Sequence, residues 1–219
     1  MTSAATRPEG EDGGRLQPHE VLITILLIVG AVAASWSSYQ ATRWNGEQAK
    51  AAGRTSALRV EASTAANLAS AQTQVDVATF IAWTDADRGG DPQLAEFYVA
   101  RFRPEFKTAF DAWQATDPFG DPSAPKTPFA MDEYVVESGV EAARLGTDAE
   151  ASSAVVAQNI QRSSNYVLSV VLYTLVLLFA GMAAKMGTRR LRTGVIVGSY
   201  LLLLAALAWV STFPVSVDV

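Results

Sequence analysis

The chain has 219 residues, 49% of them hydrophobic and 18% charged, with a formal net charge of −5. It has no cysteine and one histidine, His19, which excludes disulfides, thiolate metal sites and any site that needs two histidines within this chain. The acidic balance argues against nucleic acid as a partner, because phosphate binding requires a positive field.

The first element in chain order is an uncharged run from Val21 to Thr42, behind a polar tail over residues 1–19 that we expect to be disordered. A helix needs about 20 apolar residues to cross a bilayer, so residues 20–42 are predicted to be transmembrane helix 1. The tail before this run is acidic, whereas a cleaved signal peptide has a basic lead. We therefore interpret the run as an uncleaved signal anchor. Cleavage after Ala31-Val32-Ala33 is the alternative.

Residues 43–162 are predicted to form a helical extramembrane domain. From Thr42 to about Thr84 the sequence is rich in alanine and lacks proline, which indicates that the first span continues outward as one long helix, with Gly46 and Gly53 as places where it bends. Alanine at helical contact positions lets a neighbouring helix approach closely. The positions near a heptad spacing are Leu58, Ala65, Leu68, Gln72 and Val75.

The segment DADRGGD is predicted to be a turn, after which Asp91 caps a new helix that Pro92 begins. That helix is expected to reach about Ala115, and Pro104 should kink or split it. Phe102, Phe106 and Phe110 lie four residues apart, a stripe that is typical of a buried core.

The proline-rich segment 117–129 is predicted to be a linker with polyproline character. An ordered clasp that inserts Phe119 and Phe129 into the end of the bundle is the alternative. A short helix from Ala130 to Leu145 should end at Gly146.

Thr147 and Glu150 fit a capping box, which predicts a helix that starts there and continues through the second span. Five residues are expected to face the first long helix: Val155, Asn159, Ile160, Ser163 and Val167. The predicted fold class is therefore all-α: a membrane protein with three transmembrane helices and an extramembrane up-and-down helical bundle that is continuous with spans one and two.

The last part of the chain contains transmembrane helix 2 (163–185), a basic loop (186–192), transmembrane helix 3 (193–214) and a short tail (215–219). Short basic loops stay in the cytoplasm, so the loop and the N-terminus are predicted to be cytoplasmic and residues 43–162 extracytoplasmic. The charges that set this topology are Lys185, Arg189, Arg190 and Arg192. Basic residues that follow span one favour the opposite orientation, but they lie in a long loop, where such charges count little.

The candidate site is a cluster of aromatic and polar residues where the first span leaves the membrane and the second returns. Two interpretations stay open: an interfacial belt at the level of the lipid headgroups, or a polar cluster packed against the start of span two. Its residues are Trp36, Tyr39, Gln40, Arg43, Trp44, Asn165 and Tyr166.

Pairs of small residues four apart permit close packing of helices within one chain or between copies. They are Gly30 and Ala34, Ala180 and Ala184, and Gly194 and Gly198. No charged residue lies in the middle of a span, which disfavours a transporter or channel. The acidic residues, Asp132, Glu133 and Glu137 among them, are interpreted as solvated surface, and we predict no catalytic residue, cofactor or metal.

Three segments, WSSYQATRW (36–44), ATDPFGDPSAPKTPFAMDEY (115–134) and NYVLSVVLYTLVLLFAGM (165–182), together resemble a group of uncharacterised bacterial three-span membrane proteins. In that group a W-S-x-Y-Q-x-x-R-W segment leaves the first span, a T-P-F-x-M-x-E-Y segment follows, and two further spans close the chain. The resemblance implies a bacterial inner-membrane location and no particular activity.

We expect a non-enzymatic integral inner-membrane protein whose extracytoplasmic bundle serves interaction or sensing. The alternative is an accessory subunit of a transport or envelope-assembly complex, and a membrane enzyme ranks below both. The expected partners are the lipid bilayer and either a second copy or another membrane protein.

Overall fold

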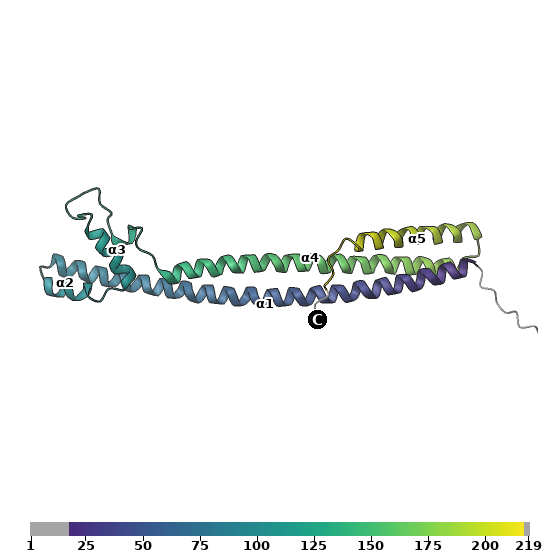
Figure 1. Cartoon of the computed structure of the whole chain (residues 1–219), viewed down its shortest axis with the longest axis horizontal. Helices are drawn as coiled ribbons and strands as arrows, with labels where there is room; N and C mark the ends of the chain where they lie inside the picture. Colours follow the sequence, from purple (N-terminus) through teal and green to yellow (C-terminus); the bar gives the residue numbers. More distant parts are fainter. Residues whose placement is uncertain (1–17, 217–219) are drawn as a thin grey trace, which may run out of the picture. The chain divides into compact units, whose positions relative to one another are not determined.

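A computed structural model describes residues 18–216, and every regular element in that range is helical, which confirms the predicted all-α fold. The predicted tail over residues 1–19 lies almost wholly outside the described residues. The elements are α1 (Pro18–Arg88), α2 (Pro92–Val99), α3 (Pro104–Gln114), the 3-10 helix η1 (Pro128–Ala130), α4 (Glu137–Lys185) and α5 (Arg189–Val210) (Figure 1).

The chain divides into two compact units, which we describe separately. The first unit contains residues up to Gln48 and from Ala157 onward, and the second contains Ala49–Val156. Both α1 and α4 are single helices that contribute residues to each unit.

Three helices are long and apolar enough to cross a membrane: α1, α4 and α5. Helix α5 begins at Arg189, inside the segment predicted as a loop, so only Met186, Gly187 and Thr188 connect it to α4. Arginine is a good helix former, and the sequence after Gly187 contains no breaker that would delay the helix start. Helix α5 also ends at Val210, short of the predicted 214.

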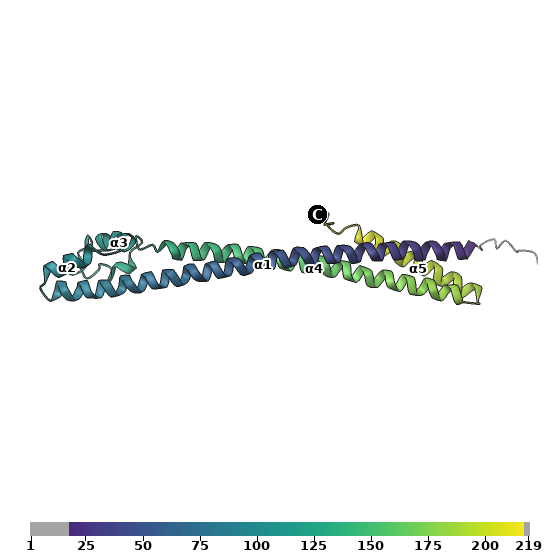
Figure 2. The same ribbon diagram turned by 90° about the horizontal axis from the view of Figure 1, so that it is seen from below.

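In the first unit, α1, α4 and α5 lie side by side around a shared apolar core (Figure 2). Leu26 of α1, Tyr173 and Val176 of α4, and Leu203 of α5 are all at most 4% exposed. Helices α1 and α4 approach closely at Gly30, where a Cβ atom would lie 2.9 Å from Leu177 Cδ2. The first pair of small residues therefore serves packing within this chain.

Glycines 194 and 198 of α5 differ from Gly30. A Cβ atom at either position would have no neighbour within 4 Å. This pair of small residues therefore makes no close helix contact within the part of the chain that the structure describes.

In the second unit, α1 and α4 form an antiparallel pair whose contact residues are small. The α1 seam repeats every seven residues at Thr55, Ala62, Ala69 and Asp76, with Leu58, Ala65 and Gln72 between them, and all seven are buried or partly buried. Across the seam, Thr55 Oγ1 donates to Ser152 Oγ at 2.9 Å, and Ser138 Oγ donates to Gln72 Oε1 at 2.6 Å.

Three of the five predicted heptad positions belong to this seam, and two do not. Leu68 and Val75 are each 53% exposed and lie on another face of α1. Helix α1 also continues unbroken past Gly46 and Gly53. Packing of the surrounding seam residues outweighs the roughly 1 kcal/mol that a glycine costs inside a helix.

Helices α2 and α3 pack against the end of α1 in the second unit. Asp91 caps α2 as predicted, since its carboxylate accepts from Leu94 N at 3.0 Å. The turn before it needs Gly90, whose φ of 78° lies in the left-handed region. Pro104 separates α2 from α3, and the predicted stripe of Phe102, Phe106 and Phe110 is buried.

The proline-rich segment is an ordered clasp on this aromatic core, as the alternative interpretation held, although only one phenylalanine is inserted. Phe129 stacks on Phe106 with ring centroids 5.2 Å apart. Trp113 Nε1 donates to Pro125 O at 2.7 Å, and Pro128 is buried. Phe119 stays 57% exposed, with the Arg88 guanidinium 3.5 Å above its ring.

The predicted short helix from Ala130 to Leu145 is wrong, and so is the capping box. Residues 131–136 are irregular, α4 begins at Glu137, and it continues through Gly146 without a break. Thr147 Oγ1 donates to Ala143 O at 3.1 Å, the bond that a threonine makes inside a helix rather than at its start. Leu145 and Ala149 are buried on the seam, and this packing keeps the segment helical.

The face that α4 turns toward α1 was predicted only in part. Asn159 and Ser163 are buried, at 4% each, whereas Val155, Ile160 and Val167 are 45–51% exposed. The contact positions recur every seven residues at Ser138, Leu145, Ser152, Asn159 and Tyr166, so the heptad spacing, and not the size or apolarity of a side chain, decides which residues face α1.

Candidate functional site

The structure divides the seven predicted cluster residues into a buried and an exposed set. Gln40, Trp44 and Tyr166 are buried, at 0%, 8% and 1% exposure. Trp36 and Tyr39 point outward, at 46% and 53% exposure, with ring centroids 6.0 Å apart. The exposed pair lies on the surface of α1, and the buried set packs between helices.

Gln40 and Tyr166 bind the chain segment that follows α5. The Gln40 amide donates from Nε2 to Ser216 O at 3.4 Å and accepts from Ser216 N at 3.0 Å. Tyr166 donates its hydroxyl proton to Pro214 O at 3.1 Å, and its ring meets Phe213 edge-on at 5.4 Å. These bonds fold residues 213–216 back onto α1 and α4.

Trp44 lies in the centre of the buried set. It forms an apolar cluster with Ala41 and Tyr166, and the Arg162 guanidinium lies 4.6 Å from its ring centroid. Ser163 Oγ donates to Ala41 O at 3.1 Å and joins the two helices at this level. The indole Nε1 of Trp44 is buried without a hydrogen-bond partner.

Arg43 and Asn165 complete the predicted cluster but take no direct part in the buried set. Asn165 Oδ1 accepts from Gln161 Nε2 of its own helix at 2.9 Å. Arg43 is half-buried, and its Nε atom is enclosed without a hydrogen-bond partner within residues 18–216. An enclosed guanidinium nitrogen without an acceptor is costly, so this position is suited to an anion.

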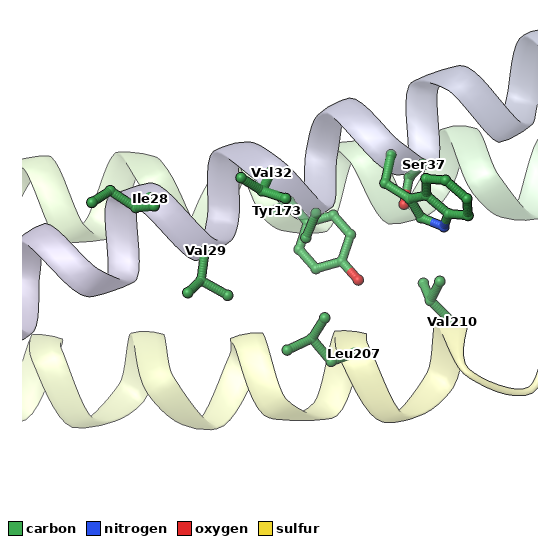
Figure 3. A pocket seen from close by; sticks show the side chains of 9 residues that line it. Ile28, Val29, Val32, Ser37, Tyr173, Leu207 and Val210 are labelled. Atoms are coloured by element: carbon green, nitrogen blue, oxygen red, sulfur yellow. The ribbon is translucent and has the colours of Figure 1, made fainter.

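Next to the cluster, an apolar groove of about 350 Å³ lies among α1, α4 and α5 (Figure 3). Helix α1 lines one side, Leu207 and Val210 of α5 line the other, and the Tyr173 hydroxyl of α4 points between these two α5 residues (Figure 3). Ser37 also lines the groove, is 0% exposed, and holds its Oγ atom without a hydrogen-bond partner. The residues contributed by α1 are Ile28, Val29, Val32, Ala33, Trp36 and Ser37.

The four predicted topology charges lie at the end of α4 and in the first turn of α5. Lys185, Arg189 and Arg190 are exposed, and Arg192 is half-buried with its Nε enclosed and unpartnered. They belong to helix ends joined by a three-residue connection rather than to a longer loop.

A second polar site, in the second unit, was not predicted. Arg103 Nε donates to Asp76 Oδ1 at 3.0 Å, and Tyr134 donates its hydroxyl proton to Asp76 Oδ2 at 3.0 Å. Burial raises the pKa of the Tyr134 phenol, and the Asp76 carboxylate beside it acts in the same direction. One signal was available in the sequence: Asp76 is the single ionisable residue among the seven seam positions of α1.

The acidic residues Asp132, Glu133 and Glu137 are exposed, in agreement with a solvated surface. Within residues 18–216 no group of three or more histidine and acidic side chains is placed to hold a metal ion. Comparison of the chain with known protein families, with curated proteins and with solved structures finds no match.

Proposed function

We propose that this chain is a non-enzymatic integral protein of the bacterial inner membrane whose extracytoplasmic helical part serves interaction or sensing. The bacterial location comes from the resemblance of three segments to a group of three-span bacterial membrane proteins. The membrane location is supported by three helices of sufficient length and apolarity.

The observation that carries the proposal is the continuity of α1 and α4. Each is one helix that begins or ends in an apolar stretch and extends through a polar, small-residue seam: 71 residues in α1 and 49 in α4. A binding event on the second unit therefore acts on backbones that are the same helices as the proposed membrane spans. This continuity also supports an uncleaved first span.

The orientation rests on Lys185, Arg189, Arg190 and Arg192, which gather at one short connection. With three spans the N-terminus lies on the same side, and residues 43–162 lie outside. An alkaline phosphatase fusion at residue 120, which is active only outside the cytoplasm, tests this assignment. An inactive fusion together with an active fusion at Gly187 overturns it.

The interaction role is tested by photo-crosslinking in native membranes. A photoreactive amino acid at Leu68 or Val75 replaces an exposed side chain and disturbs no packing. We expect defined crosslinked products, identified by mass spectrometry as a second copy or another envelope protein. Crosslinks to the subunits of a transporter would favour the accessory-subunit role. If both positions yield only the free monomer, the interaction role is contradicted.

A further inference from the structure

The groove among α1, α4 and α5 is lined almost entirely by apolar side chains, and its lining residues belong to the three proposed membrane spans. Its α1 side extends from Ile28 to Ser37, which are nine steps apart on the helix, or about 14 Å at about 1.5 Å per residue. Its volume of about 350 Å³ is that of a pocket for one small or chain-like ligand.

The length and the apolar lining of the groove select the occupant. A hollow about 14 Å long with few polar groups along it fits a single extended hydrocarbon chain. In a bilayer the hydrocarbon chains available at this depth are those of the lipids.

Ser37 lies at one end of the groove, and its hydroxyl has no hydrogen-bond partner among the described residues. Its Oγ is buried and unpartnered, although a serine inside a helix commonly donates to the carbonyl four residues earlier. Ser35, Ser169 and Ser199 in the same unit make this bond. The Ser37 hydroxyl is therefore a buried donor beside the groove that no described residue pairs with.

Arg43 continues the same line beyond the groove. Val29, Trp36 and Arg43 are spaced seven residues apart, which places them along one face of α1 with a drift of only about 20° per step. Arg43, whose Nε is enclosed and has no hydrogen-bond partner among the described residues, thus lies six residues beyond Ser37 on α1.

From this arrangement we infer a binding site for one phospholipid of the surrounding bilayer. One acyl chain fills the groove, an ester carbonyl of the glycerol backbone accepts from Ser37 Oγ, and the phosphate pairs with the guanidinium of Arg43. The three features follow α1 outward in the order in which a phospholipid presents them: hydrocarbon, ester, phosphate.

The inference rests on the membrane location proposed above but not on the interaction role. The test uses the full-length chain in vesicles of phosphatidylethanolamine and phosphatidylglycerol that contain phosphatidylglycerol with a photoreactive group in the acyl chain. Co-flotation with the vesicles confirms insertion first, so a failure of the membrane location is recognised separately.

We expect acyl labelling to concentrate on residues 28–37 of α1 and 207–210 of α5. Leu207→Trp fills the groove and should lower that labelling at least about fivefold, since overpacking by an indole excludes the chain. Leu204→Trp is the matched control, because Leu204 is 59% exposed on the same helix and does not line the groove. Even labelling of all lipid-facing positions, or equal labelling of both variants, overturns the site.

The polar contacts are tested by smaller changes that preserve the fold. Ser37→Ala removes one hydrogen bond and should weaken retention of the probe roughly two- to tenfold, whereas Ser38→Ala, at an exposed position, should not. Arg43→Gln should weaken retention of the phosphatidylglycerol probe but not of a fatty-acid probe with the same chain. If Ser37→Ala and Arg43→Gln retain the phosphatidylglycerol probe as well as the wild type does, the headgroup contacts are overturned. Crosslinks from groove residues to another protein would overturn the lipid as the occupant.

Discussion

Asp76 and Arg103, 27 residues apart in the chain, form an ion pair in which Arg103 Nε lies 3.0 Å from Asp76 Oδ1. The Asp76 side chain is 1% exposed and that of Arg103 is 19% exposed. The pair joins α1 to the residue that caps α3, and Tyr134 adds a third bond from the segment before α4. Three separate segments of the second unit therefore meet on one buried carboxylate.

Asp76→Asn should destabilise the second unit by about 2–3 kcal/mol, because removal of one partner leaves the other charge partly buried and uncompensated. The estimate lies below that for a fully enclosed pair because Arg103 reaches solvent. Thermal unfolding in detergent, followed by the fluorescence of Trp83 and Trp113, measures the change.

The control for this prediction is the pair of Lys107 and Asp111 on α3, whose side chains are 44% and 58% exposed. Asp111→Asn also removes one carboxylate from an ion pair, but at the surface, and should cost less than about 1 kcal/mol. Equal losses in the two variants would show that burial does not govern the strength of the Asp76 pair.

Tyr134 should make the second unit sensitive to alkaline pH. Burial and the neighbouring Asp76 carboxylate raise the pKa of the phenol in the folded state, so the folded state holds this proton more tightly than the unfolded state does. The resulting stability is fully present below the unfolded pKa of about 10 and is lost as the pH rises through the raised folded pKa.

Tyr134→Phe should remove this alkaline loss and lower the stability at neutral pH by about 1 kcal/mol, the value of one net hydrogen bond. Urea titrations between pH 7 and pH 11 measure both effects. Tyr98→Phe serves as the control, because Tyr98 packs on the same core without a bond to Asp76. If Tyr134→Phe keeps the full alkaline loss, another group is responsible.

Gln40→Leu should release the segment after α5. The variant removes both bonds between the Gln40 amide and Ser216 and leaves the buried backbone of Ser216 unsatisfied. We expect loss of hydrogen-exchange protection at the Ser216 amide, with little change in the protection of α5 itself. Ser38→Leu, at an exposed position two residues away, should leave the Ser216 amide protected, and the prediction fails if both variants behave alike.

Gly30→Leu should destabilise the first unit by about 1–3 kcal/mol through overpacking, since even a Cβ atom at this position lies 2.9 Å from Leu177 Cδ2. Gly198→Leu provides the comparison on α5, where a Cβ atom meets nothing within 4 Å. The measurement is the unfolding temperature of the two variants in the same detergent. A larger loss for Gly198→Leu would indicate that α5 packs against another molecule there.

The elements that the sequence predicted well are those set by strong local signals. Uniform apolarity identified the three long helices, the Asp91-Pro92 pair identified the start of α2, and Pro104 identified the break before α3. These features act within a few residues of themselves, so one sequence is sufficient to recognise them.

The errors occurred where tertiary packing overrides a local signal. Gly146 resembles a helix end and Thr147 a helix start, yet burial of Leu145 and Ala149 keeps α4 continuous across both. Leu68 and Val75 appeared to be heptad contacts because they are larger and more apolar than the alanines that form the seam. Asp76 and Arg103 were missed because their ion pair joins segments that are distant in the chain. Such a contact leaves no periodic pattern in the sequence.

Gln40, Trp44 and Tyr166 of the predicted cluster are buried together, but the segment that they bind was not foreseen. The partner of Gln40 is the backbone of Ser216, which carries no side-chain signal of a contact. The groove was not foreseen either, because it is formed by ordinary apolar residues whose gap appears only when three helices are assembled.

The seam between α1 and α4 in the second unit also restricts which insertions and deletions the sequence can accept. Thr55 faces Ser152 and Gln72 faces Ser138, so the two helices are paired position by position in opposite directions. An insertion in α1 alone would shift every later pair out of step, whereas seven residues added to both helices would preserve each partner. Homologous chains should therefore differ in this region by matched heptads, gained or lost together from residues 55–76 and 138–152.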